Sequence, residues 1–209
     1  MGVMIEGVWH AEEPASGSAD DGKYRRSVSA FRNWVTPDGA PGGEGCVGGF
    51  AAEAGRYHLY VALNCPWAHR TMIVRVLKGL EDVVSLDAVL PRRSAEGWIF
   101  AAPPEANSDS LLGSHALHKV YTAADTAFSG RVTVPVLWDK KRRTIVSNES
   151  SEIIRMLNSA FDDVGANGAD LYPTELRGDI DRVNERVYRS VNNGVYRAGF
   201  ARSQEAYEE

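Results

Sequence analysis

The residue best placed for chemistry is Cys65, in the segment Asn64-Cys65-Pro66-Trp67. A stretch rich in β-forming residues, 57–63, precedes it, and a helical pattern over 66–78 follows it. Pro66 suits the first helical turn, where its missing N–H is not needed. Cys65 is therefore predicted at a helix N-terminus, where unpaired amides and the helix dipole favour a nucleophilic thiolate over a thiol. The alternative is a buried structural cysteine beside a turn.

The chemistry of this thiol depends on which second thiol can reach it. Position 68 is Ala68, so the Cys-x-x-Cys pair of dithiol oxidoreductases is absent. A mixed disulfide on Cys65 would need an external thiol for its reduction, and glutathione is the obvious candidate. Cys46 is the other cysteine, and a Cys46–Cys65 bridge stays open because the sequence cannot establish the geometry that it requires.

A metal ion beside Cys65 has little support in the sequence. His69 lies four residues after Cys65, so a Cys/His pair of ligands is conceivable. Two ligands with no third in view make a poor site. We therefore expect no metal and interpret His69 as a residue of the helix surface or of an interface.

The composition excludes several classes of protein. The chain has 209 residues, of which 44% are hydrophobic and 24% charged, as in soluble globular proteins of one or two domains. A net charge of −5 gives no support to nucleic-acid binding. No apolar run is long enough to span a membrane, and the polar N-terminus is not a signal peptide. Two cysteines make no disulfide framework, so we expect a cytoplasmic protein. Because of the charge and the short apolar runs, we expect neither nucleic-acid nor membrane partners.

The elements that must position Cys65 follow a recognisable order. Strands are predicted at 57–63 and 83–89 with the helix 66–78 between them, which is a parallel β-α-β unit. Two further strands are predicted at 132–138 and 142–147, with Pro135 at the start of the first because proline cannot donate to a sheet. Asn148 is a good N-cap for the next helix. This order is that of a thioredoxin-like α/β fold over 56–161.

The flanking segments have a different character. Residues 1–55 lack periodicity, and we expect an extended arm whose aromatics, Phe31 and Trp34, dock onto the folded body; a disordered tail is the alternative. A polar linker is predicted at 162–172. An all-α segment, 173–209, then begins with a long helix that Asn192-Asn193-Gly194 interrupts. Ser203 can cap one more helix, which has barely begun at residue 209.

Five stretches of the chain carry a family resemblance. They are SAFRNWVTPDG, YHLYVALNCPWAHR, GWIF, GRVTVPVLWDKK with TIVSNESSEIIRMLN, and VNNGVYRAGFA. Together they resemble the glutathionyl-hydroquinone reductases, the Xi class of the glutathione transferase superfamily. A bare Cys-Pro-x-Ala would also suggest the omega class. The resemblance implies reduction of S-glutathionyl-hydroquinones by glutathione, giving hydroquinone and glutathione disulfide, in a protein that forms homodimers.

The resemblance also implies roles for particular residues. Cys65 matches the nucleophile, and Tyr196 matches a tyrosine that reaches the hydroquinone pocket from the helical domain. The positions that match contacts of glutathione are Trp98, Arg131, Val134, Glu149 and Ser150. The alternative for Tyr196 is a structural role, in which its side chain packs between domains.

The chemistry of the five glutathione positions is consistent with those roles. Glu149 and Ser150 open a helix, so Ser150 and the free amides can bind the γ-glutamyl carboxylate while Glu149 pairs with the ammonium. Val134, before an expected cis-proline, offers backbone N–H and C=O to the cysteinyl part. Arg131 offers a charge and Trp98 a flat wall. The alternatives are that Glu149 and Ser150 only cap the helix, that Arg131 is a solvated charge and that Trp98 is a core residue.

Family members continue well beyond residue 209, so we expect the helical domain to be incomplete in this chain. Two functional alternatives to the quinol reductase therefore stay open. One is an omega-like thiol transferase or dehydroascorbate reductase. The other is a glutathione-binding module whose catalysis is impaired.

Overall fold

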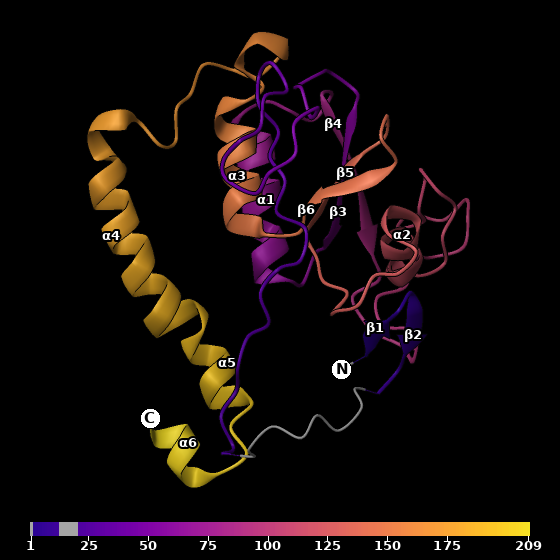
Figure 1. Ribbon diagram of the computed structural model, residues 1–209, viewed down its shortest axis with the longest axis vertical. Helices are drawn as coiled ribbons and strands as arrows, with labels where there is room; N and C mark the ends of the chain where they lie inside the picture. The colour runs from indigo at the N-terminus through magenta and orange to yellow at the C-terminus, as the bar shows by residue number, and fades with distance from the viewer. Residues whose placement is uncertain (1, 13–20) are drawn as a thin grey trace. The chain divides into compact units, whose positions relative to one another are not determined.

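The computed structural model describes residues 2–12 and 21–209, which fall into two compact units (Figure 1). The first unit contains residues 2–12 and 29–170. The second contains residues 21–28 and 171–209.

The first unit is built on a four-stranded mixed sheet. Its strands are β3 (Tyr57–Ala62), β4 (Val84–Val89), β5 (Val136–Asp139) and β6 (Thr144–Ser147), in the order β4-β3-β5-β6. β3 pairs parallel with β4 and antiparallel with β5, and β5 pairs antiparallel with β6. The predicted thioredoxin-like arrangement is therefore confirmed.

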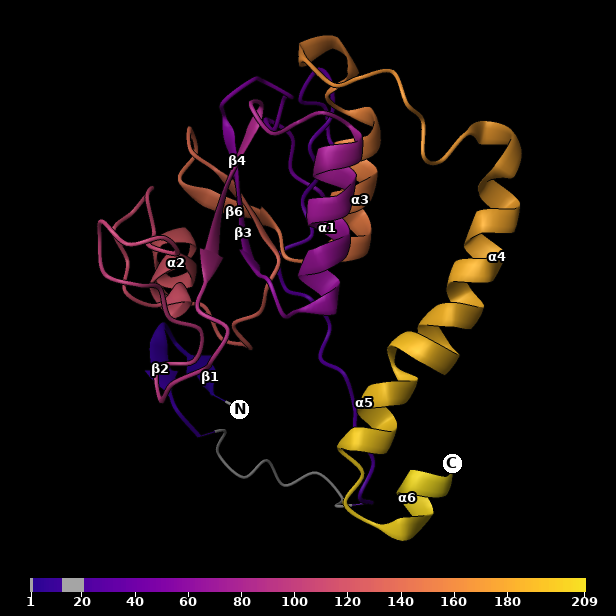
Figure 2. The ribbon, with the colours of Figure 1, turned by 180° about the vertical axis from the view of Figure 1, so that it is seen from behind.

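Helices cover both faces of this sheet. α1 (Pro66–Leu77) and α3 (Ser150–Ser159) lie side by side on one face, and α2 (Leu117–Ala124) lies on the other (Figures 1 and 2). Every residue of β3 is buried, as expected for a central strand covered on both sides. The ends of β3 and of its partner β5 are joined by a buried ion pair between Arg56 and Asp139.

The N-terminal segments are more ordered than the sequence indicated. β1 (Val3–Ile5) and β2 (Val8–His10) form an antiparallel hairpin, and Met4 exchanges backbone hydrogen bonds with Gly130 at 2.8 and 2.9 Å. Residues 29–36 run along β6, where Asn33 N–H donates to the Val146 carbonyl at 2.9 Å. The Phe31 ring stacks on Phe128 at 5.4 Å, so this part of the arm docks through an aromatic as expected.

The segment predicted as a linker is packed against the first unit as far as Asp170. Lys78, at the end of α1, is almost fully buried, and its ammonium donates to the Ala169 carbonyl at 2.6 Å and to Asp162 at 2.8 Å. The Asn167 side chain donates to the Leu77 carbonyl at 2.7 Å. A buried ammonium requires such partners, and this requirement holds the segment in place.

The second unit is helical in its described part. After a 3-10 turn (Thr174–Leu176), α4 (Arg177–Val187) continues into a π-helical turn (Tyr188–Asn192), and α5 (Gly194–Gly199) and α6 (Gln204–Glu208) follow. Ser203 caps α6, because its hydroxyl accepts from Ala206 N–H at 3.2 Å. Within the described residues, no helix is long and apolar enough to cross a membrane.

Candidate functional site

Cys65 lies where the sequence placed it, between the end of β3 and the start of α1. It is the N-cap residue of α1, with extended backbone angles (φ −97°, ψ 116°), and its side chain makes no capping hydrogen bond. The half-buried sulfur lies 3.7 Å from the backbone oxygen of Val134. The thiol is therefore held at a helix N-terminus without being used to cap it.

The second cysteine takes no part in this arrangement. Cys46 and Cys65 are both free, so the bridge between them that the sequence left open is absent from the structure. The Cys46 thiol donates instead to the Arg32 carbonyl at 3.3 Å. Cys65 therefore has no resolving thiol within the described part of the chain.

The segment facing Cys65 leads into β5 at Val134-Pro135, whose peptide bond is cis, as expected. Val134 itself is 6% exposed. The sequence predicted that its N–H and C=O would both be free, whereas the carbonyl receives the long contact from the Cys65 thiol.

Glu149 and Ser150 open α3 beside this segment. Glu149 is the N-cap residue: one carboxylate oxygen accepts from Ser151 N–H at 3.1 Å and the other from the Ser29 hydroxyl at 2.9 Å. The sequence predicted Asn148 in this role, and that prediction is wrong. The Asn148 side chain does not cap α3 because it is hydrogen-bonded elsewhere. It accepts from Phe31 N–H at 3.1 Å and also bonds to other groups of the core.

Arg70 joins the N-terminus of α3 to α1. Its guanidinium donates twice to the Ser150 hydroxyl, at 3.0 and 2.7 Å, and lies 3.6 Å from the Glu149 carboxylate. It also lies over the Trp67 ring, at 5.0 Å from the centroid. Sequence reasoning assigned Arg70 no role, although it closes the CPWAHR stretch that carried the family resemblance. It belongs to the candidate site.

The charge state of Glu149 follows from these contacts. Burial alone would raise its pKa, but hydrogen bonds from Ser151 and Ser29 and the charge of Arg70 outweigh burial and hold the pKa below its ordinary value. Glu149 is therefore a carboxylate at neutral pH. A carboxylate and a guanidinium then stand together at a helix N-terminus, which suits a ligand carrying both an ammonium and a carboxylate.

Trp98 and Arg131 lie in loops of the same unit. Trp98 is 6% exposed and belongs to the core, and the Arg93 guanidinium lies 4.3 Å from its ring centroid. Its buried indole N–H has no hydrogen-bond partner among the described residues. Leaving a buried donor without an acceptor costs free energy unless a ligand or water accepts from it. Trp98 therefore packs in the core and also offers a hydrogen-bond donor. Arg131 is half-buried, three residues before Val134.

Tyr196 is the one candidate in the second unit. It lies on α5, where its ring stacks on Tyr24 at 5.8 Å and on Phe200 at 6.0 Å. The Arg26 guanidinium lies over the same ring, at 4.6 Å from its centroid. A role for Tyr196 beside Cys65 stays a prediction.

Comparison with known proteins agrees with this geometry. A family profile described as glutathione S-transferase, N-terminal domain matches residues 64–160. The chain is 57% identical over 210 residues to glutathionyl-hydroquinone reductase YqjG of Escherichia coli K12, covering all of this chain and 63% of that protein. It is 49% identical to glutathionyl-hydroquinone reductase PcpF of Sphingobium chlorophenolicum, again covering all of this chain and 63% of the relative.

Solved structures give the same result. The glutathione-bound structure of YqjG from Escherichia coli K-12 superposes with a TM-score of 0.86 at 54% identity, over 99% of this chain and 61% of that one. A Xi-class transferase from Natrialba magadii superposes with a TM-score of 0.85 at 41% identity, over 100% of this chain and 60% of that one. The chain thus spans about three-fifths of the length of these relatives. It belongs to the Xi class of the glutathione transferase superfamily.

Proposed function

We propose that this chain binds glutathione and performs the thiol-transfer steps of a glutathionyl-hydroquinone reductase. The Cys65 thiolate attacks the sulfur of an S-glutathionyl-hydroquinone, forming a Cys65–glutathione disulfide. The electron pair of the broken carbon–sulfur bond passes to the aromatic carbon, which takes a proton and leaves as the hydroquinone. A glutathione thiolate then attacks the mixed disulfide, giving glutathione disulfide and restoring Cys65.

The observation that carries the proposal is the placement of Cys65. A cysteine that begins a helix but does not cap it keeps its sulfur available, facing the free amides and the positive end of the helix dipole. The backbone of Val134 stands beside the sulfur. A peptide laid along Val134 as an added strand would bring its own sulfur to Cys65.

The glutathione contacts are proposed from the charges at the start of α3. The γ-glutamyl carboxylate would accept hydrogen bonds from the Ser150 hydroxyl and the neighbouring amides, and Arg70 would supply the positive charge opposite it. The ammonium would pair with Glu149, which is ionised. Arg131 would hold the remaining carboxylate. Trp98 would form a flat wall whose indole N–H donates to the ligand.

The hydroquinone step needs a proton donor near the aromatic carbon. We assign this role to Tyr196, whose phenol can donate a proton or bind a quinol oxygen. Because Ala68 provides no second thiol, release of the mixed disulfide depends on glutathione, and the kinetics should be ping-pong. Homodimer formation and a cytoplasmic location belong to the same proposal.

The names of the relatives support the proposal. YqjG and PcpF are named glutathionyl-hydroquinone reductases, and the superposed YqjG structure is described as glutathione-bound. The chain covers 63% of both proteins, so the activity is proposed for this chain on the strength of its site.

The experiment compares two substrates. The chain is incubated with glutathione and either glutathionyl-menadiol or dehydroascorbate, and release of menadiol or ascorbate is measured with Cys65→Ser and Cys46→Ser as matched variants. Menadiol release that requires Cys65 and not Cys46 is expected. Faster reduction of dehydroascorbate would favour an omega-like transferase. Glutathione binding without turnover of either substrate would leave a binding module and overturn the catalytic proposal.

A further inference from the structure

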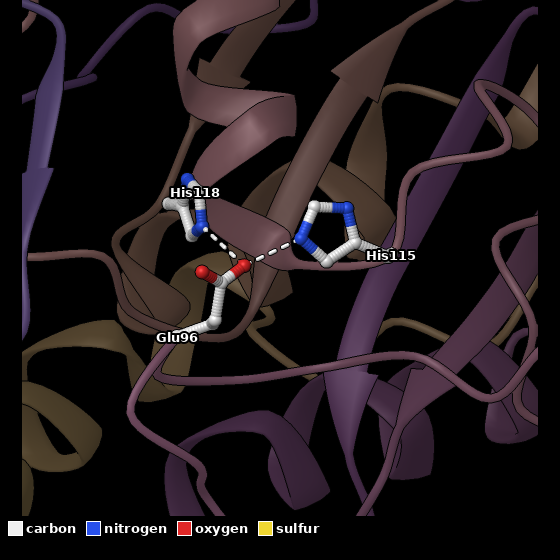
Figure 3. Close-up of side chains that lie close together, drawn as sticks. All are labelled: Glu96, His115 and His118. Carbon is white, nitrogen blue, oxygen red and sulfur yellow. Dashed lines mark hydrogen bonds and ion pairs between the residues drawn. The ribbon is translucent and has the colours of Figure 1, made fainter.

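Away from Cys65, three side chains converge that the proposed reaction does not use. Glu96, His115 and His118 point toward one another (Figure 3). Their ligand-capable atoms all lie within 4.8 Å of one another. One oxygen of Glu96, Oε2, lies 2.5 Å from His115 Nε2 and 3.5 Å from His118 Nε2.

The carboxylate is held by a tight turn. Ser94 and Gly97 exchange backbone hydrogen bonds at 2.9 and 3.0 Å, and the Ser94 hydroxyl accepts from Glu96 N–H at 3.0 Å. Gly97 has φ +73°, a conformation that favours glycine. Glu96 is therefore presented from a closed turn and not from a loose loop.

The buried imidazole is fixed by the N-terminal hairpin. His118, on α2, has a side chain that is 4% exposed, and its ring stacks on Trp9 at 5.0 Å with an interplanar angle of 9°. Trp9 also donates from its indole N–H to the Ala95 carbonyl at 2.9 Å. The same indole thus positions both His118 and the turn that carries Glu96.

His118 Nε2 is buried and has no hydrogen-bond partner among the described residues, and Glu96 stands only at ion-pair distance. A buried ring nitrogen without a hydrogen bond is costly, so its environment calls for another partner. It is directed toward the same carboxylate oxygen that His115 contacts (Figure 3). A metal ion between the three groups would satisfy it.

We propose that Glu96, His115 and His118 bind a divalent transition metal ion, with Zn²⁺ as the best fit. Two imidazole nitrogens and one carboxylate oxygen are a recurrent ligand set for Zn²⁺ with three protein ligands, and the fourth position is left to water. Mg²⁺ and Ca²⁺ prefer oxygen ligands and suit this set poorly. In a tetrahedral site with bonds of about 2.0–2.1 Å the ligand atoms stand roughly 3.4 Å apart. The 3.5 Å separation of Glu96 and His118 already fits this spacing, whereas His115, at 2.5 Å from Glu96, would have to move away from the carboxylate.

The sequence pattern alone did not indicate this site. His118 lies in the first turn of α2 and His115 lies just before that helix, but Glu96 lies nineteen residues before His115 in a segment of weak pattern. Gly97 separates Glu96 from Trp98, so an ion here would fix the backbone next to the proposed glutathione wall.

The test is metal binding by the full chain with both cysteines replaced, Cys46→Ser and Cys65→Ser, because thiolates also bind Zn²⁺. Zn²⁺ is titrated by calorimetry, and Co²⁺ is used as a probe through its visible absorption. We expect one equivalent of Zn²⁺, a rise in melting temperature, and a Co²⁺ spectrum of low coordination number.

The variants decide which residues are the ligands. His115→Ala and Glu96→Gln change side chains that are 64% and 49% exposed, so both should fold without metal. Each should weaken Zn²⁺ binding by about tenfold or more and abolish the Co²⁺ absorption. His69→Ala, at another exposed histidine, is the matched control and should leave both unchanged. Absence of Zn²⁺ binding, or equal affinity in His115→Ala and the parent, would leave a metal-free His–Glu contact and overturn the proposal.

Discussion

Replacing Glu149 by Gln separates its role as a helix cap from its role as a charge. The amide oxygen of glutamine can still accept from Ser151 N–H, as the carboxylate does at 3.1 Å, so α3 keeps its cap. The variant loses the negative charge that would pair with the γ-glutamyl ammonium. A charge-assisted hydrogen bond contributes about 1.5–3 kcal/mol, so glutathione affinity should fall roughly ten- to hundredfold.

The assay is calorimetric titration of glutathione together with thermal melts on the same samples. Glu152→Gln is the matched control, since Glu152 lies on the same helix and pairs with Arg32. Glu149→Ala removes both the cap and the charge, and it should lower affinity and stability together. Unchanged affinity in Glu149→Gln, with a lowered melting temperature in Glu149→Ala, would show that Glu149 only caps the helix.

Three further predictions follow from the contacts described. Because the pKa of Glu149 lies below its ordinary value of 4.5, its contribution to stability should be complete above pH 4.5 and lost as the pH falls through the lower folded pKa; denaturant melts against pH, compared with Glu149→Gln, measure this. Asp139→Ala should cost about 3–5 kcal/mol in urea unfolding because it leaves Arg56 buried without its main partner. Glu53→Ala, at an exposed partner of the same arginine, should cost much less, and equal losses would refute the difference. Tyr196→Phe should slow hydroquinone release by about 10²–10⁴-fold and spare reduction of cystine-glutathione disulfide, and equal loss on both substrates would make Tyr196 structural.

The centre of the fold could be predicted because local signals agree with one another there. Cys65-Pro66 after an apolar run predicts a strand end and a helix start, and the structure has both within a residue or two. Pro135 correctly marks the start of a strand, although β5 begins only at Val136. These signals depend on backbone chemistry within a few residues, which the sequence displays directly.

The features that were missed depend on tertiary contacts. Glu149 is the N-cap residue of α3 because the Asn148 side chain is hydrogen-bonded to Phe31 N–H, in a residue more than a hundred positions away. Arg70 was missed because its partner Ser150 lies on another helix.

The large apolar residues of α1 are not the ones that it buries most deeply. Its fully buried residues are Ala68 and Thr71. Ile73, Val76 and Leu77 are about half exposed. Small side chains face inward here, which a count of large apolar residues does not detect.

The most direct test of the proposed chemistry is the mass of the chain after exposure to glutathionyl-menadiol without free glutathione. The placement of Cys65 predicts a gain of one glutathionyl group, located on Cys65 by peptide mapping and removed by excess glutathione. Cys46→Ser should still form the adduct, and Cys65→Ser should not. A folded chain that gains no glutathionyl group, or gains it only on Cys46, would contradict the assignment of Cys65 as the nucleophile.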